Sequence, residues 1–208
     1  MNRYVILQCT NRLCNFRFPA EVGNYGIYCP LCGNELTVRE YRVDNGYAQF
    51  NKKDTALECV LDNVRSSYNV GSIFRSASAF SVARLFLCGF TPTPDQAKVR
   101  KTSLGAEKFV LWSHEPNALQ LIQQKKEQGY QIIAIEASLS AQSLLDWSIK
   151  SGEQKVLLIF GNEIFGIDPE IRAFSDALLQ IPITGDKKSL NVAAAFSISV
   201  FYFSSCLS

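Results

Sequence analysis

Four cysteines within the first 32 residues have a spacing that suits a bound metal ion. They are Cys9, Cys14, Cys29 and Cys32, two close pairs separated by fourteen residues. The turn Cys29-Pro-Leu-Cys-Gly33 lets two thiolates face one ion, and its glycine relieves backbone strain. Four buried apolar cysteines would not account for this paired spacing. Because a module of about 40 residues rarely folds on hydrophobic burial alone, we expect residues 1–45 to form a zinc ribbon with structural zinc.

Three later segments place polar side chains directly after an apolar run. They span residues 58–77, 155–170 and 181–196, and each passes from a strand-like run through a polar turn into the start of a helix. Such turns leave backbone N–H groups free for a ligand. In a parallel sheet, the carboxyl ends of the strands lie at the same edge, so the turns that follow them are neighbours. A well-capped core helix is the alternative for the last segment taken alone. Together the three predict one polar site.

The elements that must position this site alternate along the chain. Strand-like runs lie at 59–61, 85–88, 109–112, 131–137, 155–160 and 178–183, and helical patterns at 69–80, 116–128, 169–174 and 189–203. This alternation is typical of an α/β fold, with a mostly parallel sheet and helices on both faces. The Asn45-Gly46 turn signal favours a linker at 46–54, so we expect the α/β domain at 55–208.

Composition describes a globular protein without a strong electrostatic signature. Hydrophobic residues make up 47%, charged residues 19%, and the net charge is +2. Contacts with a nucleic acid would have to come from local clusters, namely Lys98, Arg100, Lys101, Lys108, Lys187 and Lys188. The first residues contain no apolar core of a signal peptide, and the apolar run 192–203 is shorter than the roughly 20 residues of a membrane span. We expect a cytoplasmic protein with reduced cysteines.

The three polar segments carry sequence motifs in a specific order. They read N-x-G-x-x-x-R at Asn69 to Arg75, G-N-E-x-x-G at Gly161 to Gly166, and I-P-I-x-G-x-x-x-S-L-N-V at Ile181 to Val192. Over roughly residues 55–205 they resemble the motifs of the SpoU-type RNA ribose 2′-O-methyltransferases, of the SPOUT superfamily. The basic stretch Lys98 to Ala106 resembles the loop between the first two motifs. The cysteine-rich segment stands where the family usually carries a ribosomal-protein-like RNA-binding domain.

The resemblance implies a fold, a cofactor and an assembly. A C-terminal trefoil knot would form the pocket for S-adenosylmethionine, with Gly161, Ile181 and Leu190 contacting the cofactor largely through backbone atoms. The substrate would be a ribose 2′-hydroxyl in tRNA or rRNA. The family is homodimeric, and the apolar helix at 192–203 has little polar surface to face solvent alone. Each site would then combine Arg75 of one subunit with the cofactor of the other.

The same resemblance suggests catalytic residues, and their chemistry narrows their roles. A guanidinium stays protonated, so Arg75 is better suited to hold the RNA phosphate beside the target hydroxyl than to act as a base, although a base role stays open. We expect Asn69 to hold the turn or the ribose, and Glu163 to orient Arg75 or Asn69. Ser189 and Asn191 would complete the shell around the hydroxyl and the cofactor. The single histidine, His114, is expected to be structural.

Alternative functions remain open from the sequence. The chain could be a catalytically inactive knotted module that binds RNA or protein, although the full set of motif residues argues against lost activity. A Rossmann-type methyltransferase is disfavoured because no G-x-G-x-x-G follows a first strand. The ribbon's aromatic residues could stack on unpaired RNA bases or form its own small core; they are Phe16, Phe18, Tyr25 and Tyr28.

Overall fold

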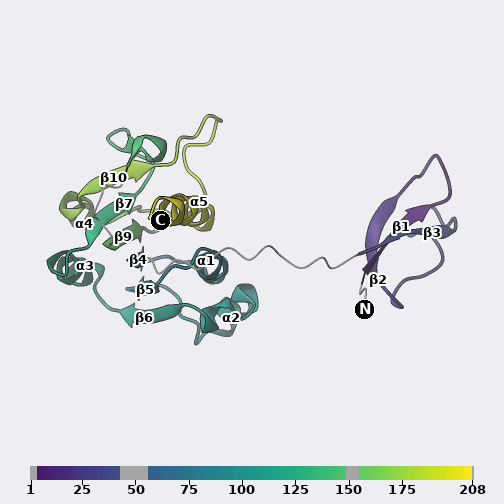
Figure 1. Cartoon of the computed structure of the whole chain (residues 1–208), viewed down its shortest axis with the longest axis horizontal. Helices are drawn as coiled ribbons and strands as arrows, with labels where there is room; N and C mark the ends of the chain where they lie inside the picture. The colour runs from purple at the N-terminus through teal and green to yellow at the C-terminus, as the bar shows by residue number, and fades with distance from the viewer. Residues whose placement is uncertain (1–3, 43–55, 149–154, 208) are drawn as a thin grey trace. The chain divides into compact units, whose positions relative to one another are not determined.

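A computed structural model describes residues 4–42, 56–148 and 155–207 (Figure 1). The chain divides into two compact units, residues 1–51 and 52–208, and each is described by itself. The expected linker at 46–54 and the boundary at residue 45 lie outside the described residues. Within the described residues no helix combines the length and apolar character that crossing a membrane requires.

The smaller unit is an antiparallel sheet of three strands in the order β2-β1-β3. They are β1 (Tyr4–Cys9), β2 (Arg17–Glu21) and β3 (Leu36–Tyr41). Side chains alternate along β1, so that Val5, Leu7 and Cys9 are buried on one face. Few other apolar side chains of this unit are buried, and the sheet therefore has only a small hydrophobic core.

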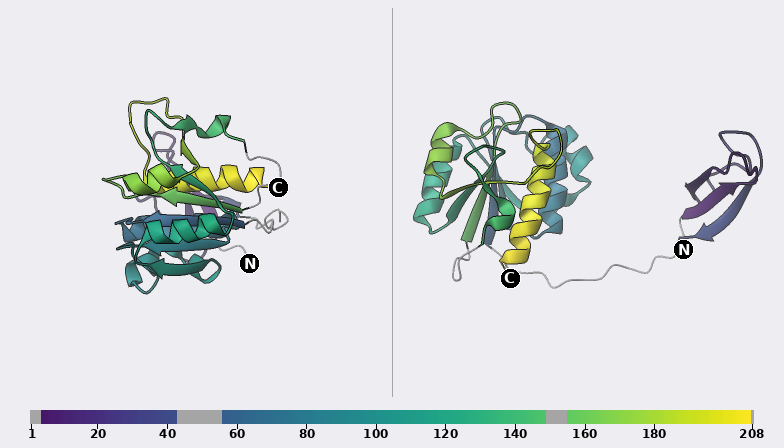
Figure 2. Two further views of the ribbon diagram at one scale, coloured as in Figure 1. Left: turned by 90° about the vertical axis from the view of Figure 1, so that its left-hand side faces the viewer. Right: turned by 90° about the horizontal axis from the view of Figure 1, so that it is seen from above.

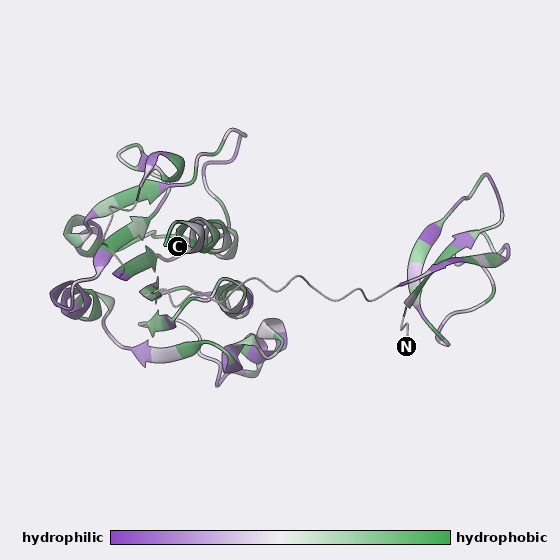
Figure 3. Cartoon of the chain, in the orientation of Figure 1, coloured by the Kyte–Doolittle hydropathy of each residue, from purple (hydrophilic) through white to green (hydrophobic). Residues whose placement is uncertain are grey.

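The larger unit is built on a seven-stranded sheet in the order β6-β5-β4-β9-β7-β10-β8, and every recorded pairing in it is parallel. The strands are β4 (Ala56–Asp62), β5 (Arg84–Cys88), β6 (Leu111–Glu115), β7 (Gln131–Ile135), β8 (Gln142–Ser143), β9 (Lys155–Phe160) and β10 (Ala177–Gln180). The central strands β4 and β9 are mostly apolar and buried on both faces, and Figure 3 shows them largely in green; Glu58 within β4 is a buried exception. The predicted parallel α/β class is confirmed.

Helices cover both faces of this sheet, as Figures 1 and 2 show. α1 (Ser67–Ala79) and α5 (Val192–Cys206) pack on one face, where Phe74 and Phe196 join the core residues of β4 and β9. α3 (Ala118–Glu127) and α4 (Pro169–Phe174) cover the other face through Ile122 and Ile171. The helix predicted at 169–174 has these same bounds, while α5 begins at Val192 because Asn191 caps it.

The segment between α1 and β6 differs from the sequence expectation in the type of structure that it forms. Residues 98–106 are expected to form a loop, but α2 (Ala97–Ser103) is helical and is followed by the 3-10 helix η1 (Ala106–Lys108). The helix forms because Val99 is buried and Gly71 of α1 lets α2 approach closely: a Cβ on Gly71 would lie 2.5 Å from Cβ of Thr102. Because η1 occupies Ala106–Lys108, the strand expected at 109–112 begins only at Leu111, as β6. A second short 3-10 helix, η2 (Leu144–Asp146), follows β8.

Candidate functional site

A cavity of about 550 Å³ opens at the carboxyl ends of β7, β9 and β10. Six of the residues predicted for the site line it, from two of the three motif segments: Gly161, Glu163, Ile181, Ser189, Leu190 and Asn191. Apolar walls come from Ile135, Phe160 and Ile167. The cavity therefore combines exposed backbone, apolar surface and a polar rim, which are the features of a small-molecule site.

The loop after β9 is a tight turn that needs glycine at both ends. Asn162 and Gly166 exchange two backbone hydrogen bonds, of 3.0 and 2.9 Å, and Oδ1 of Asn162 accepts from the backbone N–H groups of Ile164 and Phe165. A Cβ on Gly161 would lie 2.4 Å from the carbonyl carbon of Gly166, and Gly166 has a φ of 82°. Glycine at these two positions lets the backbone form the cavity wall.

Glu163 connects this turn to the start of α1. Its carboxylate accepts hydrogen bonds from the backbone N–H groups of Arg65 (2.8 Å) and Ser66 (3.1 Å) and from Nδ2 of Asn69 (2.9 Å). The first turn of α1 contains no acidic residue, so Glu163 supplies the negative charge that a helix N-terminus favours. Burial raises the pKa of Glu163, but the three hydrogen bonds outweigh it and leave the pKa below its ordinary value.

The third motif joins the same network through Asn191. Its Nδ2 donates to Oδ1 of Asn69 over 3.0 Å, and its own Oδ1 accepts from the N–H of Ala193, which caps α5. Glu163 is expected to orient Arg75 or Asn69, and in the structure it accepts a hydrogen bond from Asn69. One amide, that of Asn69, thus receives fixed partners from both later motifs, and the network ties the N-termini of α1 and α5 to the cavity rim.

Arg75 lies apart from this cavity. It is exposed on α1, six residues beyond Asn69 and therefore about 9 Å further along the helix axis. No hydrogen bond or ion pair of Arg75 is recorded among the described residues, and it does not line the cavity. Within one chain, Arg75 and the cavity are therefore not brought together. His114 also lies elsewhere, on β6, where its Nε2 contacts the carbonyl oxygen of Gly89 at 2.7 Å.

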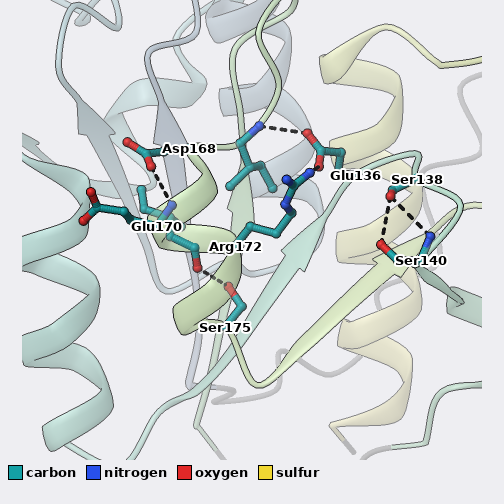
Figure 4. Close-up of polar contacts among 9 residues, drawn as sticks. Glu136, Ser138, Ser140, Asp168, Glu170, Arg172 and Ser175 are labelled. Carbon is teal, nitrogen blue, oxygen red and sulfur yellow. Dashed lines mark hydrogen bonds and ion pairs between the residues drawn. The ribbon is translucent and has the colours of Figure 1, made fainter.

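Glu136 is a cavity residue that sequence reasoning missed. It directly follows β7, and its Oε1 accepts from the N–H of Ile167 (2.9 Å) while Oε2 pairs with Nη1 of Arg172 (3.2 Å). Figure 4 shows Arg172 reaching from α4 toward this carboxylate. The sequence pattern assigned residues 131–137 to one strand. The only available signal was a charged residue at the carboxyl end of an apolar run.

The four cysteines of the smaller unit converge on one point. Their sulfur atoms all lie within 4.8 Å of one another, with 3.4 Å between Cys9 and Cys32 and 3.8 Å between Cys14 and Cys29. These separations exceed a disulfide bond of about 2.05 Å and match the spacing of about 3.8 Å around tetrahedral zinc with Zn–S bonds of about 2.3 Å. Burial raises the pKa of Cys9 to about 12, while hydrogen bonds from Asn34 lower the pKa of Cys32 to about 6. The donor set suits zinc.

Comparison with known proteins identifies relatives of the larger unit. The sequence profile of the SpoU rRNA Methylase family matches residues 56–201. An uncharacterized tRNA/rRNA methyltransferase of Borreliella burgdorferi is 31% identical over 158 residues, which cover 76% of this chain and 68% of the relative. The tRNA (guanosine(18)-2′-O)-methyltransferase of Aquifex aeolicus is 30% identical over 168 residues, covering 80% of this chain and 77% of that protein.

Solved structures agree with this assignment. The TrmH/SpoU tRNA modifying enzyme of A. aeolicus has a TM-score of 0.65 and 26% identity, covering 74% of this chain and 76% of that one. The AdoMet-bound rRNA methyltransferase from Sinorhizobium meliloti has a TM-score of 0.63 and 25% identity, covering 82% of this chain and 64% of that one. The family match begins at residue 56, so the cysteine cluster lies outside it.

Proposed function

The chain belongs to the SpoU rRNA Methylase family, and on that premise we propose that it transfers a methyl group from S-adenosylmethionine to a ribose 2′-hydroxyl of tRNA or rRNA. The observation that carries this proposal is the hydrogen-bonded set Glu163, Asn69 and Asn191 at the rim of a glycine-walled cavity. The names of the relatives and solved structures above include tRNA and rRNA methyltransferases, and both substrates enter the proposal for that reason.

The cavity fits an adenosyl cofactor by its surface chemistry. Gly161 offers backbone without a side chain, Ile181 and Leu190 add apolar contact, and Ile135 and Phe160 provide the wall for a planar adenine ring. When bound, the cofactor supplies a methyl group on a positively charged sulfonium. The exposed Ser189 lies on the rim, where its hydroxyl can bind a polar group of the cofactor or of the ribose.

The polar network is suited to holding the ribose that reacts. Both ends of the Asn69 amide are occupied, by Glu163 and by Asn191, so its orientation is fixed before RNA binds. Preorganised hydrogen-bonding groups lower the cost of aligning the 2′-hydroxyl with the methyl group. Glu163 acts in this scheme as a positioning residue for Asn69 and for the N-terminus of α1.

Arg75 requires a second subunit in this proposal. We infer a homodimer in which Arg75 of one subunit contacts the RNA phosphate and the target hydroxyl beside the cofactor of its partner. The exposed apolar side chains Ile198 (42%) and Phe201 (59%) of α5, with Phe201 packed edge-on against Phe80, support an interface near α1 and α5. The predicted trefoil knot stays part of the proposal, because the loops at 160–167 and 181–192 line one cavity.

The cysteine cluster is proposed to hold structural zinc, and the ribbon to select RNA in the cytoplasm. Cys9, Cys14, Cys29 and Cys32 would be the ligands. Of the ribbon's four aromatic residues, Phe16 and Phe18 stack on each other at 4.9 Å, whereas Tyr25 and Tyr28 are 37% and 60% exposed. The two tyrosines are therefore the better candidates for stacking on unpaired bases. Deletion of residues 1–45 should weaken RNA binding several-fold and leave cofactor affinity unchanged.

The direct test uses tritiated S-adenosylmethionine with bulk tRNA and rRNA from a strain that lacks the protein. Methylation of the 2′-hydroxyl protects the adjacent phosphodiester from alkali, so the label should appear in alkali-resistant dinucleotides. Protein that binds the cofactor and RNA without incorporating label would instead be the inactive binding module. Label in mononucleotides would indicate base methylation and refute the ribose assignment.

A further inference from the structure

Glu136 is a charged side chain that the cavity wall holds largely out of solvent. Its side chain is 18% exposed, and it lines the cavity beside the apolar residues Ile135 and Ile167. A carboxylate kept in such a place costs free energy unless its acceptor sites are used. It has about four acceptor positions, and the contacts with Ile167 and Arg172 occupy two of them. Acceptor capacity therefore remains on a group that borders the cavity.

The strand order puts Glu136 in the middle of the proposed cofactor wall. β7, which ends at Ile135, lies between β9 and β10 in the sheet. Gly161 follows β9 and Ile181 follows β10, so the two backbone segments proposed to contact the adenosyl group flank Glu136. The Glu163 network contacts the start of α1, which follows β4 on the far side of β9. Glu136 thus belongs to the adenosine part of the cavity rather than to the methyl-transfer rim.

The neighbouring groups hold the carboxylate in one orientation. Oε1 lies where a side chain on Gly166 would stand, since a Cβ there would be 2.1 Å away. Ile167 donates to the same oxygen, and Arg172 donates to the other one from α4. The glycine that closes the second motif therefore makes room for Glu136. A carboxylate fixed by two donors, one from the loop after β9 and one from α4, is preorganised to receive a ligand.

We propose that the Glu136 carboxylate accepts hydrogen bonds from the ribose hydroxyl groups of the adenosyl cofactor, with Arg172 as a positioning residue. A vicinal diol presents two donors, and a carboxylate presents two oxygens at matching spacing; dinucleotide-binding folds use an acidic residue on a ribose hydroxyl in the same way. This inference rests on the proposed function, because it takes the cavity to be the cofactor site.

Binding calorimetry on the full chain tests the assignment with S-adenosylhomocysteine and its 2′,3′-dideoxy analogue. Glu136→Gln should weaken binding of the parent compound roughly ten- to a hundredfold, the effect of losing charged hydrogen bonds. The dideoxy analogue should bind wild type weakly and lose nothing further in the variant. Glu170→Gln is the matched control, since Glu170 is an exposed acid on the same helix as Arg172 and its carboxylate has no recorded partner among the residues that the structure describes.

A second variant and a third probe separate the remaining outcomes. Arg172→Ala should lower affinity for the parent compound but not for the dideoxy analogue, and Arg172→Lys should restore part of it. 5′-Methylthioadenosine lacks the amino-acid moiety, so an unchanged affinity for it in Glu136→Gln would assign Glu136 to the cofactor's ammonium group and overturn the proposal. If Glu136→Gln lost the same affinity for the parent compound and for the dideoxy analogue, Glu136 would only stabilise the cavity wall, and the proposal would be wrong. Wild type that binds none of the probes would overturn the proposed function itself.

Discussion

Replacement of Glu163 tests whether the cavity rim is held together by one carboxylate. Glu163→Ala removes three hydrogen bonds and the charge at the N-terminus of α1. Net hydrogen bonds contribute about 0.5–1.5 kcal/mol each, and a charge at a helix N-terminus about 0.3–1 kcal/mol. Because Glu163 is exposed, solvent screening places each contribution near the lower end, and we expect a loss of about 1.5–2.5 kcal/mol. Methyl transfer should fall further than stability, since Asn69 loses its fixed orientation.

Thermal unfolding followed by far-UV circular dichroism measures this loss. All helices of the described residues belong to the larger unit, so the helical signal follows that unit. At roughly 2–4 °C per kcal/mol for a domain of this size, the Tm should fall by about 3–10 °C. Glu127→Gln is the control, because Glu127 is an exposed glutamate on α3 whose carboxylate has no hydrogen bond or ion pair recorded within the described ranges.

The effect should also depend on pH in a defined direction. The folded pKa of Glu163 lies below its ordinary value of 4.5, so its contribution is complete above 4.5 and is lost as the pH falls through the folded value. The difference in Tm between wild type and Glu163→Gln should therefore narrow as the pH is lowered from neutral through 4.5. A difference that stays constant across this range, or variants as stable as the control, would refute the assigned role.

Three further predictions concern catalysis, assembly and metal. Arg75→Ala should abolish methyl transfer while calorimetry finds cofactor affinity unchanged; lost affinity would make Arg75 a cofactor ligand. The double substitution Ile198→Asp and Phe201→Asp should convert a dimer into an inactive monomer by light scattering, and mixing it with Arg75→Ala should not restore activity, whereas an active monomer would rule out the shared site. Chelation of zinc should unfold residues 1–45 without changing cofactor affinity, and a thiol reagent should then react with Cys9 and Cys29, which are buried in the folded unit. Thiols of Cys9 and Cys29 that stay unreactive after chelation would contradict the metal assignment.

The sequence predicted the larger elements because their apolar runs are long and regular. The parallel sheet, α4 and the gathering of Glu163 and Asn191 on one cavity followed from strand-to-helix turns, which meet at one sheet edge. α2 was missed because its amphipathic pattern is brief and its stability comes from contact with Gly71, more than 25 residues away. Glu136 was missed for a related reason: its partners Ile167 and Arg172 become neighbours only in the folded sheet.

The hydrogen bonds around Asn69 also constrain the order of events during synthesis of the chain. Its partner Glu163 lies 94 residues later and Asn191 lies 122 residues later. At a translation rate of about 5–20 residues per second, roughly 5–20 s pass between the synthesis of Asn69 and that of Glu163. During this time the first turn of α1 has no acidic residue at its N-terminus. Throughout that interval the sheet can grow while the rim of the cavity stays incomplete. The cavity rim is therefore completed only when α5 emerges. Since α5 also supplies Phe196, Val200 and Phe203 to the core, the binding site and the core on that face of the sheet are completed at the same stage of synthesis.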